Sequence, residues 1–99
     1  MAAYVVFTRE RTRDAGELAK YSQAAGAAGA GHPIKPLALY GKHESLEGSA
    51  HEGCVILEFP TMDAAKAWYN SPAYTAARAH RFNGADYRVF VVEGFSMPS

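Results

Sequence analysis

The stretch 54–82, CVILEFPTMDAAKAWYNSPAYTAARAHRF, decides the fold of this protein. It opens with the strand-favouring run Cys54–Phe59, and Pro60 ends the run because proline cannot continue a strand ladder. Thr61 follows as a favoured helix N-cap, since its hydroxyl can accept a backbone N–H of the first turn. The stretch therefore predicts a strand that leads directly into a helix over residues 62–70.

The predicted helix is interrupted at Ser71 and Pro72. Serine is a favoured N-cap and proline a favoured first helical residue, so a second short helix is predicted over Ala73–Phe82, at an angle to the first. The apolar side of the first helix, which we expect to pack on a sheet, consists of Ala64, Ala65, Trp68 and Tyr69.

The amino-terminal part of the chain predicts another strand and helix. Ala3–Arg9 is a short run of strand formers that is apolar on both sides, as in the middle of a sheet. Asp14 follows as a helix N-cap, and one helical face then carries Leu18, Tyr21 and Ala25.

Two further strands complete the predicted order. Leu37–Leu46 has the pattern of an edge strand with a bulge at Gly41. Tyr87–Val92 is the last strand, and Asn83–Gly84 is a predicted turn before it. The order β-α-β-β-α-β predicts one α+β, ferredoxin-like domain over residues 1–99, a four-stranded antiparallel sheet with two helices on one face.

Both faces of the predicted sheet are apolar. In the first strand Tyr4 and Val6 point to one face while Val5 and Phe7 point to the other, and the last two strands alternate in the same way. Two helices cover only one face, and a large apolar sheet face is rarely left in water. We therefore expect a homodimer in which the uncovered faces of two sheets pack together.

The composition excludes several classes of partner and site. Ten Lys and Arg balance ten Asp and Glu, which disfavours binding to nucleic acids or to anionic membrane surfaces. All apolar runs are far shorter than the roughly 20 residues that cross a bilayer, so a cytoplasmic location is expected. The single cysteine, Cys54, permits neither an intrachain disulfide nor a cysteine-rich zinc site.

Three segments of the chain resemble the DUF1330 family, small bacterial proteins of undefined function in the dimeric α/β-barrel superfamily. They are AAYVV at 2–6, SLEG at 45–48 and VILEFPTMDAAKAWYNSPAYTAAR at 55–78, within which EFP followed by AWYNSPAY is the specific part. The resemblance implies the ferredoxin-like fold and the dimer. It implies no particular reaction, because fold and function are separable.

The helix break gathers the candidate substrate-binding residues. Two physical features favour a ligand here, because free backbone N–H groups at a helix start attract anions and arginine offers forked donors to a carboxylate. Packing of the aromatic rings and capping by the serine would explain the same residues without a ligand, and both interpretations stay open. The candidates are Trp68, Tyr69, Ser71, Tyr74 and Arg81.

His43 and Glu58 are the candidate catalytic residues. His43 is predicted on the edge strand beside the cleft between sheet and helices, and histidine titrates near neutral pH. Glu58 interrupts an apolar central strand, where a carboxylate needs a partner or a raised pKa. A structural ion pair, with Arg88 or with the dimer mate, is the alternative role for Glu58.

No metal and no cofactor is expected. The four histidines show neither an HxH pattern nor an i, i+4 pair on a helix. A heme enzyme of the superfamily would place a tryptophan and a histidine on the second helix. Trp68 and His80 are reminiscent of that pattern, but their spacing is too long and Thr8 stands where an asparagine would be wanted.

These observations predict a small-molecule enzyme of the dimeric α/β-barrel type. Enzymes of the superfamily that the chain resembles include cofactor-independent oxygenases, decarboxylases and isomerase-like enzymes. We therefore expect proton transfer or oxygenation on a small, planar organic substrate, of which an organic anion is one class. The alternative is a non-catalytic metabolite-binding or stress-related dimer, and a domain that caps another protein's sheet is the third hypothesis.

Overall fold

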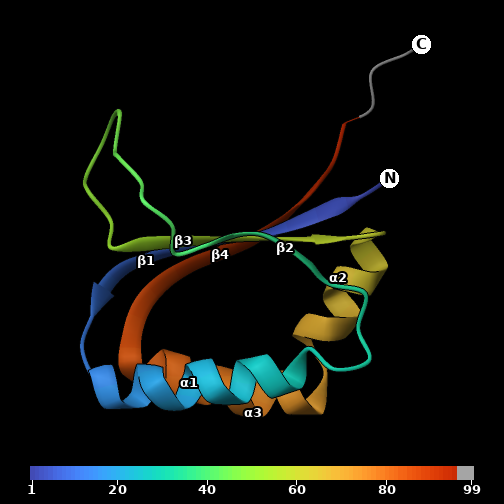
Figure 1. Ribbon diagram of the computed structural model, residues 1–99, viewed down its shortest axis with the longest axis horizontal. Helices are drawn as coiled ribbons and strands as arrows, with labels where there is room; N and C mark the ends of the chain where they lie inside the picture. The colour runs from blue at the N-terminus through green and yellow to red at the C-terminus, as the bar shows by residue number, and fades with distance from the viewer. Residues whose placement is uncertain (96–99) are drawn as a thin grey trace.

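The computed structural model describes residues 1–95 as a four-stranded sheet with three helices (Figure 1). The elements, in chain order, are β1 (Ala3–Thr12), α1 (Ala15–Ala28), β2 (Lys35–Leu39), β3 (Gly53–Phe59), α2 (Met62–Tyr69), α3 (Pro72–Gly84) and β4 (Ala85–Glu93).

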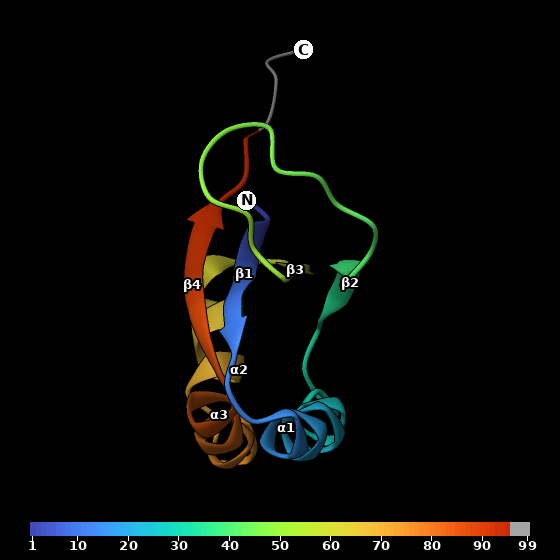
Figure 2. The ribbon, with the colours of Figure 1, turned by 90° about the vertical axis from the view of Figure 1, so that its left-hand side faces the viewer.

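The strands follow the order β2-β3-β1-β4 and all pairs are antiparallel. All three helices lie on one side of the sheet, α1 below the β2 edge and α3 below the β4 edge (Figures 1 and 2). This arrangement confirms the predicted ferredoxin-like order, including the predicted break between α2 and α3.

The alternation of side chains in the strands is also confirmed. Toward the helices, Val5 and Phe7 of β1 are buried together with Val55, Leu57 and Phe59 of β3. Residues between them, on the face without helices, are only half-buried or exposed.

Local capping explains where each helix begins. Asp14, Thr61 and Ser71 have extended backbones, and each side chain accepts a hydrogen bond from the backbone N–H three residues later. The Ser71 hydroxyl also donates to the carbonyl of Trp68 at 2.7 Å, which joins the end of α2 to the start of α3. The break is therefore stabilised from within the chain.

The turn predicted at Asn83–Gly84 is wrong, because α3 continues to Gly84 and β4 begins at the next residue. The Gly84 carbonyl accepts the backbone N–H groups of Arg13 and Asp14 at 2.8 and 2.9 Å, which ties this junction to the start of α1. A side chain at Gly84 would meet Leu18 atoms at 3.0 Å, so close helix packing, rather than a turn, requires the glycine.

The strand predicted over Leu37–Leu46 is shorter and starts earlier, at Lys35, and it ends at Leu39. Tyr40 has a φ of 53°, in the left-handed region, and turns the chain out of the strand. The predicted edge position and bulge are present, but the register shifts between Pro36 and Ala38 and not at Gly41. Residues 41–52 form neither helix nor strand.

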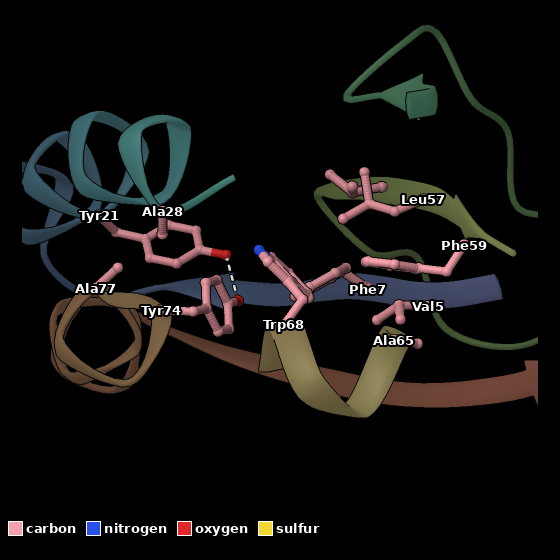
Figure 3. Packing of buried hydrophobic residues seen from close by; sticks show 11 residues of the cluster. Val5, Phe7, Tyr21, Ala28, Leu57, Phe59, Ala65, Trp68, Tyr74 and Ala77 are labelled. Carbon is pink, nitrogen blue, oxygen red and sulfur yellow. Dashed lines mark hydrogen bonds between the residues drawn. The ribbon is translucent and has the colours of Figure 1, made fainter. Parts of the chain in front are cut away.

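The core is centred on Trp68, which is 3% exposed (Figure 3). Its indole lies 5.5 Å from the Phe59 ring, 6.3 Å from Phe7 and 4.1 Å from Tyr74, measured between ring centroids. The predicted packing of α2 on the sheet is therefore confirmed, and the ring of Tyr74 joins α3 to the same cluster.

Truncation of Phe59 to alanine tests the importance of this core. Phe59 is 1% exposed, so the Phe59→Ala substitution should lower the free energy of unfolding by about 3–5 kcal/mol through lost burial and a cavity. The matched Phe95→Ala change, at a ring that is 81% exposed, should alter it by no more than about 0.5 kcal/mol. Urea denaturation measures both, and equal losses would contradict this description of the core.

Candidate functional site

A cavity of about 530 Å³ lies between α1 and the sheet, within the size range of small-molecule sites. Its roof is formed by Phe7, Val55 and Leu57, and Trp68 forms part of its wall. The helix α1 and the segment after it contribute the floor, with Tyr21, Ser22, Ala25, Gly26, Gly29, His32 and Ile34. Most of these groups are apolar, so the few polar ones define what the cavity can hold.

Tyr21, which lines the cavity, forms a buried pair of phenols with Tyr74. Their hydroxyl oxygens lie 2.7 Å apart, joining α1 to α3 (Figure 3). Burial raises the pKa of both phenols above the ordinary value, so both are neutral at physiological pH.

Arg81, on α3, is a buried cation beside this pair and is only 3% exposed. Within residues 1–95, no carboxylate forms an ion pair with it and its Nε finds no hydrogen-bond partner. Its guanidinium carbon lies 5.1 Å from the ring centroid of Tyr87 and 6.0 Å from that of Tyr21. The positive charge also opposes the effect of burial on Tyr21 and Tyr74 by lowering the pKa of each phenol.

The indole nitrogen of Trp68 is a second buried donor. In the described part of the chain, this N–H has no hydrogen-bond acceptor, although the residue lines the cavity. Figure 3 shows the nitrogen on the side of the ring that faces the Tyr21 and Tyr74 hydroxyls. Buried indole N–H groups usually have an acceptor, so this one marks a polar site.

A second phenol pair, Tyr40 and Tyr87, lies close to the first. Their hydroxyl oxygens are 2.6 Å apart, and burial together with this hydrogen bond raises the pKa of Tyr40. Tyr40 lines the cavity, and its phenol contributes to the raised pKa of Tyr21, which lines the cavity as well.

These groups together form a cluster with an excess of donors. In each phenol pair one hydroxyl donates to the other, which leaves one O–H free to donate elsewhere. Arg81 and Trp68 are donors only. An oxyanion of a bound molecule, such as a carboxylate, phenolate or enolate, would satisfy these donors, and the hydrogen bonds would be charge-assisted.

The structure brings together three of the predicted substrate-binding residues and separates two others. Trp68, Tyr74 and Arg81 belong to the donor cluster described above. Ser71 uses its hydroxyl within the cap of α3. Tyr69 lines a separate hollow of about 180 Å³ between α2 and β4, under the guanidinium of Arg78 at 4.2 Å.

The two predicted catalytic residues lie away from the cavity lining. His43 follows the end of β2 in the irregular segment, where its ring stacks on His51 at 4.9 Å and is exposed. Glu58 lies on the sheet face without helices, opposite Tyr4 and Lys35 in the register. We therefore assign neither residue a role in the cavity chemistry.

The suggested ion pair between Glu58 and Arg88 is not present. Arg88 of β4 is separated from β3 by β1, and its Nε lies 3.2 Å from a carboxylate oxygen of Glu10 instead. Lys35 of β2 is the cationic neighbour of Glu58 across the strand pair.

Among the residues that the structure describes, no group of three or more His, Cys, Asp or Glu side chains could hold a metal ion. His80 instead contacts the Glu17 carboxylate at 2.6 Å, on the outer surface of α1 and α3. No helix within residues 1–95 is long and apolar enough to span a membrane.

Three residues of the cavity lining were not among the candidates predicted from the sequence: Tyr21, Tyr40 and His32. Tyr21 was predicted as a buried helix residue, but the partner of its hydroxyl comes from a helix 53 residues away. Tyr40 falls in the strand predicted over Leu37–Leu46, and His32 was considered only as one of four histidines that lack a metal-binding pattern. A polar residue on the buried side of a helix is the one signal that pointed to Tyr21.

Known proteins similar to this chain share its fold. The family described as "Domain of unknown function (DUF1330)" matches residues 2–95. A protein of unknown function from Rhodopseudomonas palustris is similar with a TM-score of 0.74 and 19% identity, over 97% of this chain and 84% of that one. A dimeric protein of unknown function and ferredoxin-like fold from Bacteroides fragilis has a TM-score of 0.67 and 16% identity, over 94% and 96%.

SnoaB, a cofactor-independent oxygenase from Streptomyces nogalater, has a TM-score of 0.63 and 10% identity, over 97% of this chain and 95% of that one. No curated protein matches the chain. At these identities the likeness establishes the ferredoxin-like fold alone.

The raised pKa of Tyr74 predicts how stability depends on pH. Because the folded state favours the neutral phenol, its contribution is complete below the unfolded pKa of about 10 and is lost as the pH rises further. The difference in unfolding free energy between the protein and its Tyr74→Phe variant should be constant from neutral pH to about pH 10. Above this pH the native protein should lose stability relative to the variant. Urea denaturation across this range measures it, and a constant difference at all pH values would contradict the buried phenol.

Proposed function

The chain belongs to the DUF1330 family, and we propose that it is a small-molecule enzyme that binds a planar organic anion and acts by proton transfer or oxygenation. The buried Arg81, which has no carboxylate partner among residues 1–95, is the observation that carries this proposal. Burying an unpaired charge is costly, and active sites are where such costs are commonly met.

The form of the cavity supports a planar, conjugated ligand. Aromatic and aliphatic side chains line most of it, and the members of the donor cluster in this lining are Tyr21, Tyr40 and Trp68. An oxyanion bound there would have its charge held by Arg81 and the phenols in surroundings of low polarity, where such interactions are strongest. The rest of a flat molecule would lie between α1 and the sheet.

His32 is the proton acceptor that this proposal requires. It lines the cavity just beyond the end of α1, is half-buried, and its imidazole makes no hydrogen bond within the described residues. A neutral imidazole can act as a general base and remove a proton from carbon when the resulting charge is delocalised. Conjugation through the ligand would carry that charge to an oxygen held by Arg81.

Two reactions share this first step. The base takes a proton from carbon, and the electron pair of the broken C–H bond remains on the planar anion. Return of a proton to another carbon completes an isomerisation. Transfer of electrons from the anion to dioxygen begins an oxygenation, and the similarity to the cofactor-independent oxygenase SnoaB supports this second outcome.

We also propose that the protein is a homodimer joined through the open face of the sheet. The register places Phe90, Val6, Ile56 and Ala38 in one row across that face. Phe90 is 54% exposed in the single chain, and Val92 beside it is 46% exposed. The similar proteins from Bacteroides fragilis and Thermobifida fusca are described as dimeric, which supports the same assembly here.

The alternative function is a metabolite-binding dimer without turnover. It is favoured by the scarcity of titratable groups in the cavity lining, of which His32 and two phenols are the only ones within the described residues. Native mass spectrometry of gently purified protein would identify a retained molecule for both functions. Incubation of that molecule with the protein in deuterated, aerated water separates them: an enzyme adds deuterium or oxygen and loses this activity in His32→Gln, whereas a binding protein leaves the molecule unchanged.

Binding of para-nitrobenzoate tests the anion site, because nitroaromatic rings quench the fluorescence of a neighbouring tryptophan. Trp68 is the sole tryptophan, so quenching reports this cavity. Arg81→Met should weaken binding at least about tenfold, or 1.4 kcal/mol, through the loss of charge-assisted hydrogen bonds. Arg78→Met, a matched change on the same helix outside the donor cluster, should leave affinity unchanged. Equal affinities in the two variants, or equal binding of neutral para-nitrobenzamide, would contradict the anion site.

Ile56→Asp tests the dimer, because it places a carboxylate in the middle of the apolar row on the open face. Sedimentation velocity should show a dimer for the native protein and a folded monomer for the variant. A native protein that is monomeric at all concentrations would contradict the proposed interface. Leu46→Asp, at an exposed residue outside the sheet, is the control that should remain dimeric.

A further inference from the structure

The floor of the cavity is one face of α1, and this face carries only small side chains over the second half of the helix and its cap. Ser22, Ala25, Gly26 and Gly29 all line the cavity, at the spacing of i, i+3, i+4 and i+7 that places residues on one side of a helix. A helix that covers a sheet normally presents large apolar residues on that side. Their absence here leaves the space between α1 and the sheet open.

Neither packing nor backbone conformation requires a glycine at position 26. Gly26 lies inside α1, its φ is not positive, and a Cβ atom there would meet nothing within 4 Å. Gly84, by contrast, is required by its close contact with Leu18. A glycine inside a helix lowers stability relative to alanine, because it loses more backbone freedom on folding. Gly26 therefore lowers the stability of the fold without improving its packing.

An independent observation indicates that the space beside Gly26 holds a ligand. Trp68 lines the same cavity and is 3% exposed, and its indole N–H has no acceptor among residues 1–95. Buried donors of this kind usually have an acceptor. The small-residue face of α1 therefore borders a space that also presents an unpaired donor, which points to a bound molecule rather than to loose packing alone.

The groups that the proposed reaction uses lie at the two ends of this face. Tyr21 of the donor cluster lies at its start and His32, the proposed proton acceptor, lies just beyond its end, and both line the cavity. A ligand with its oxyanion near Tyr21 and its reacting carbon near His32 therefore extends past Gly26. Gly26 lines the cavity and is exposed in the single chain, so it lies where the cavity opens to solvent.

We propose that Gly26 is a specificity-determining residue, because the absence of a side chain at this position leaves the opening of the cavity to the ring of the substrate. This inference rests on the proposed anion site. The substrate class is then an organic anion whose planar part lies against the backbone of α1, opposite Val55 and Leu57 of the sheet. A flat ring can approach a helix backbone closely only where no Cβ atom stands in its way.

The stability and the ligand affinity of Gly26 variants should change in opposite directions. Gly26→Ala and Gly26→Leu introduce better helix formers at a position where a Cβ atom meets nothing within 4 Å, so the midpoint of urea denaturation should rise in both. Binding of para-nitrobenzoate, followed by quenching of Trp68 fluorescence, should weaken at least about tenfold in Gly26→Leu, because the side chain occupies the place of the ring. Gly26→Ala should weaken it less.

Ala27→Leu is the matched control, since Ala27 is the next residue of α1, is exposed, and is not part of the cavity lining. It should bind para-nitrobenzoate as the native protein does. Unchanged affinity in a Gly26→Leu variant that is folded by circular dichroism would overturn the proposal, as would equal losses of affinity in Gly26→Leu and Ala27→Leu. A lower denaturation midpoint in Gly26→Ala would show that the fold itself requires the glycine and would also overturn it.

Neutral para-nitrobenzamide separates this inference from the anion site. Equal binding of the carboxylate and the amide by the native protein, with both weakened by Gly26→Leu, would contradict the anion site and support the place of the ring beside Gly26. Binding of the carboxylate that is weakened by Arg81→Met and not by Gly26→Leu would support the anion site and overturn the role of Gly26. Binding of neither probe by the native protein would contradict both proposals.

Discussion

The buried guanidinium of Arg81 is the constraint around which the interior of this protein is organised. A charge that is 3% exposed must be compensated, and here the compensation within residues 1–95 comes from aromatic rings rather than from carboxylates. The same charge lowers the pKa of the neighbouring phenols against the effect of burial. The interior therefore combines a cation with neutral donors, which is the combination that stabilises an oxyanion and not a cationic or purely apolar ligand.

A helix break and the close approach of two helices position these groups. The break between α2 and α3, closed by the Ser71 cap, directs Trp68 into the sheet and Tyr74 toward α1. The close approach of α1 and α3, which requires Gly84, brings Tyr21 to Tyr74. Since all helices cover one face of the sheet, the cavity is on that face, and the apolar row around Val6 and Ile56 is left without a covering helix.

The sequence allowed most of the fold to be predicted, because its signals are local. Pro60 with Thr61, Ser71 with Pro72, and the alternation in β1 and β3 each depend on neighbouring residues. The end of β2 was wrong because the chain leaves the strand at Tyr40, which has a positive φ and whose ring packs closely over Gly53 of another strand. Trp68, Tyr74 and Arg81, which residue type had made candidates, lie together in the structure, whereas His43 was a candidate because it was assigned to a strand that ends before it. The phenol pairs could not be predicted, since each joins elements that are distant in sequence.

The central claim is that the donors around Arg81 bind an organic anion, and the indole N–H of Trp68 offers the most direct test. With one tryptophan in the chain, a proton–nitrogen correlation spectrum contains a single indole resonance. Addition of para-nitrobenzoate should move this resonance to lower field and slow the exchange of its proton with water, as a hydrogen bond to the carboxylate forms. An indole resonance that stays in place at saturating concentrations of this and other aromatic carboxylates would contradict the account.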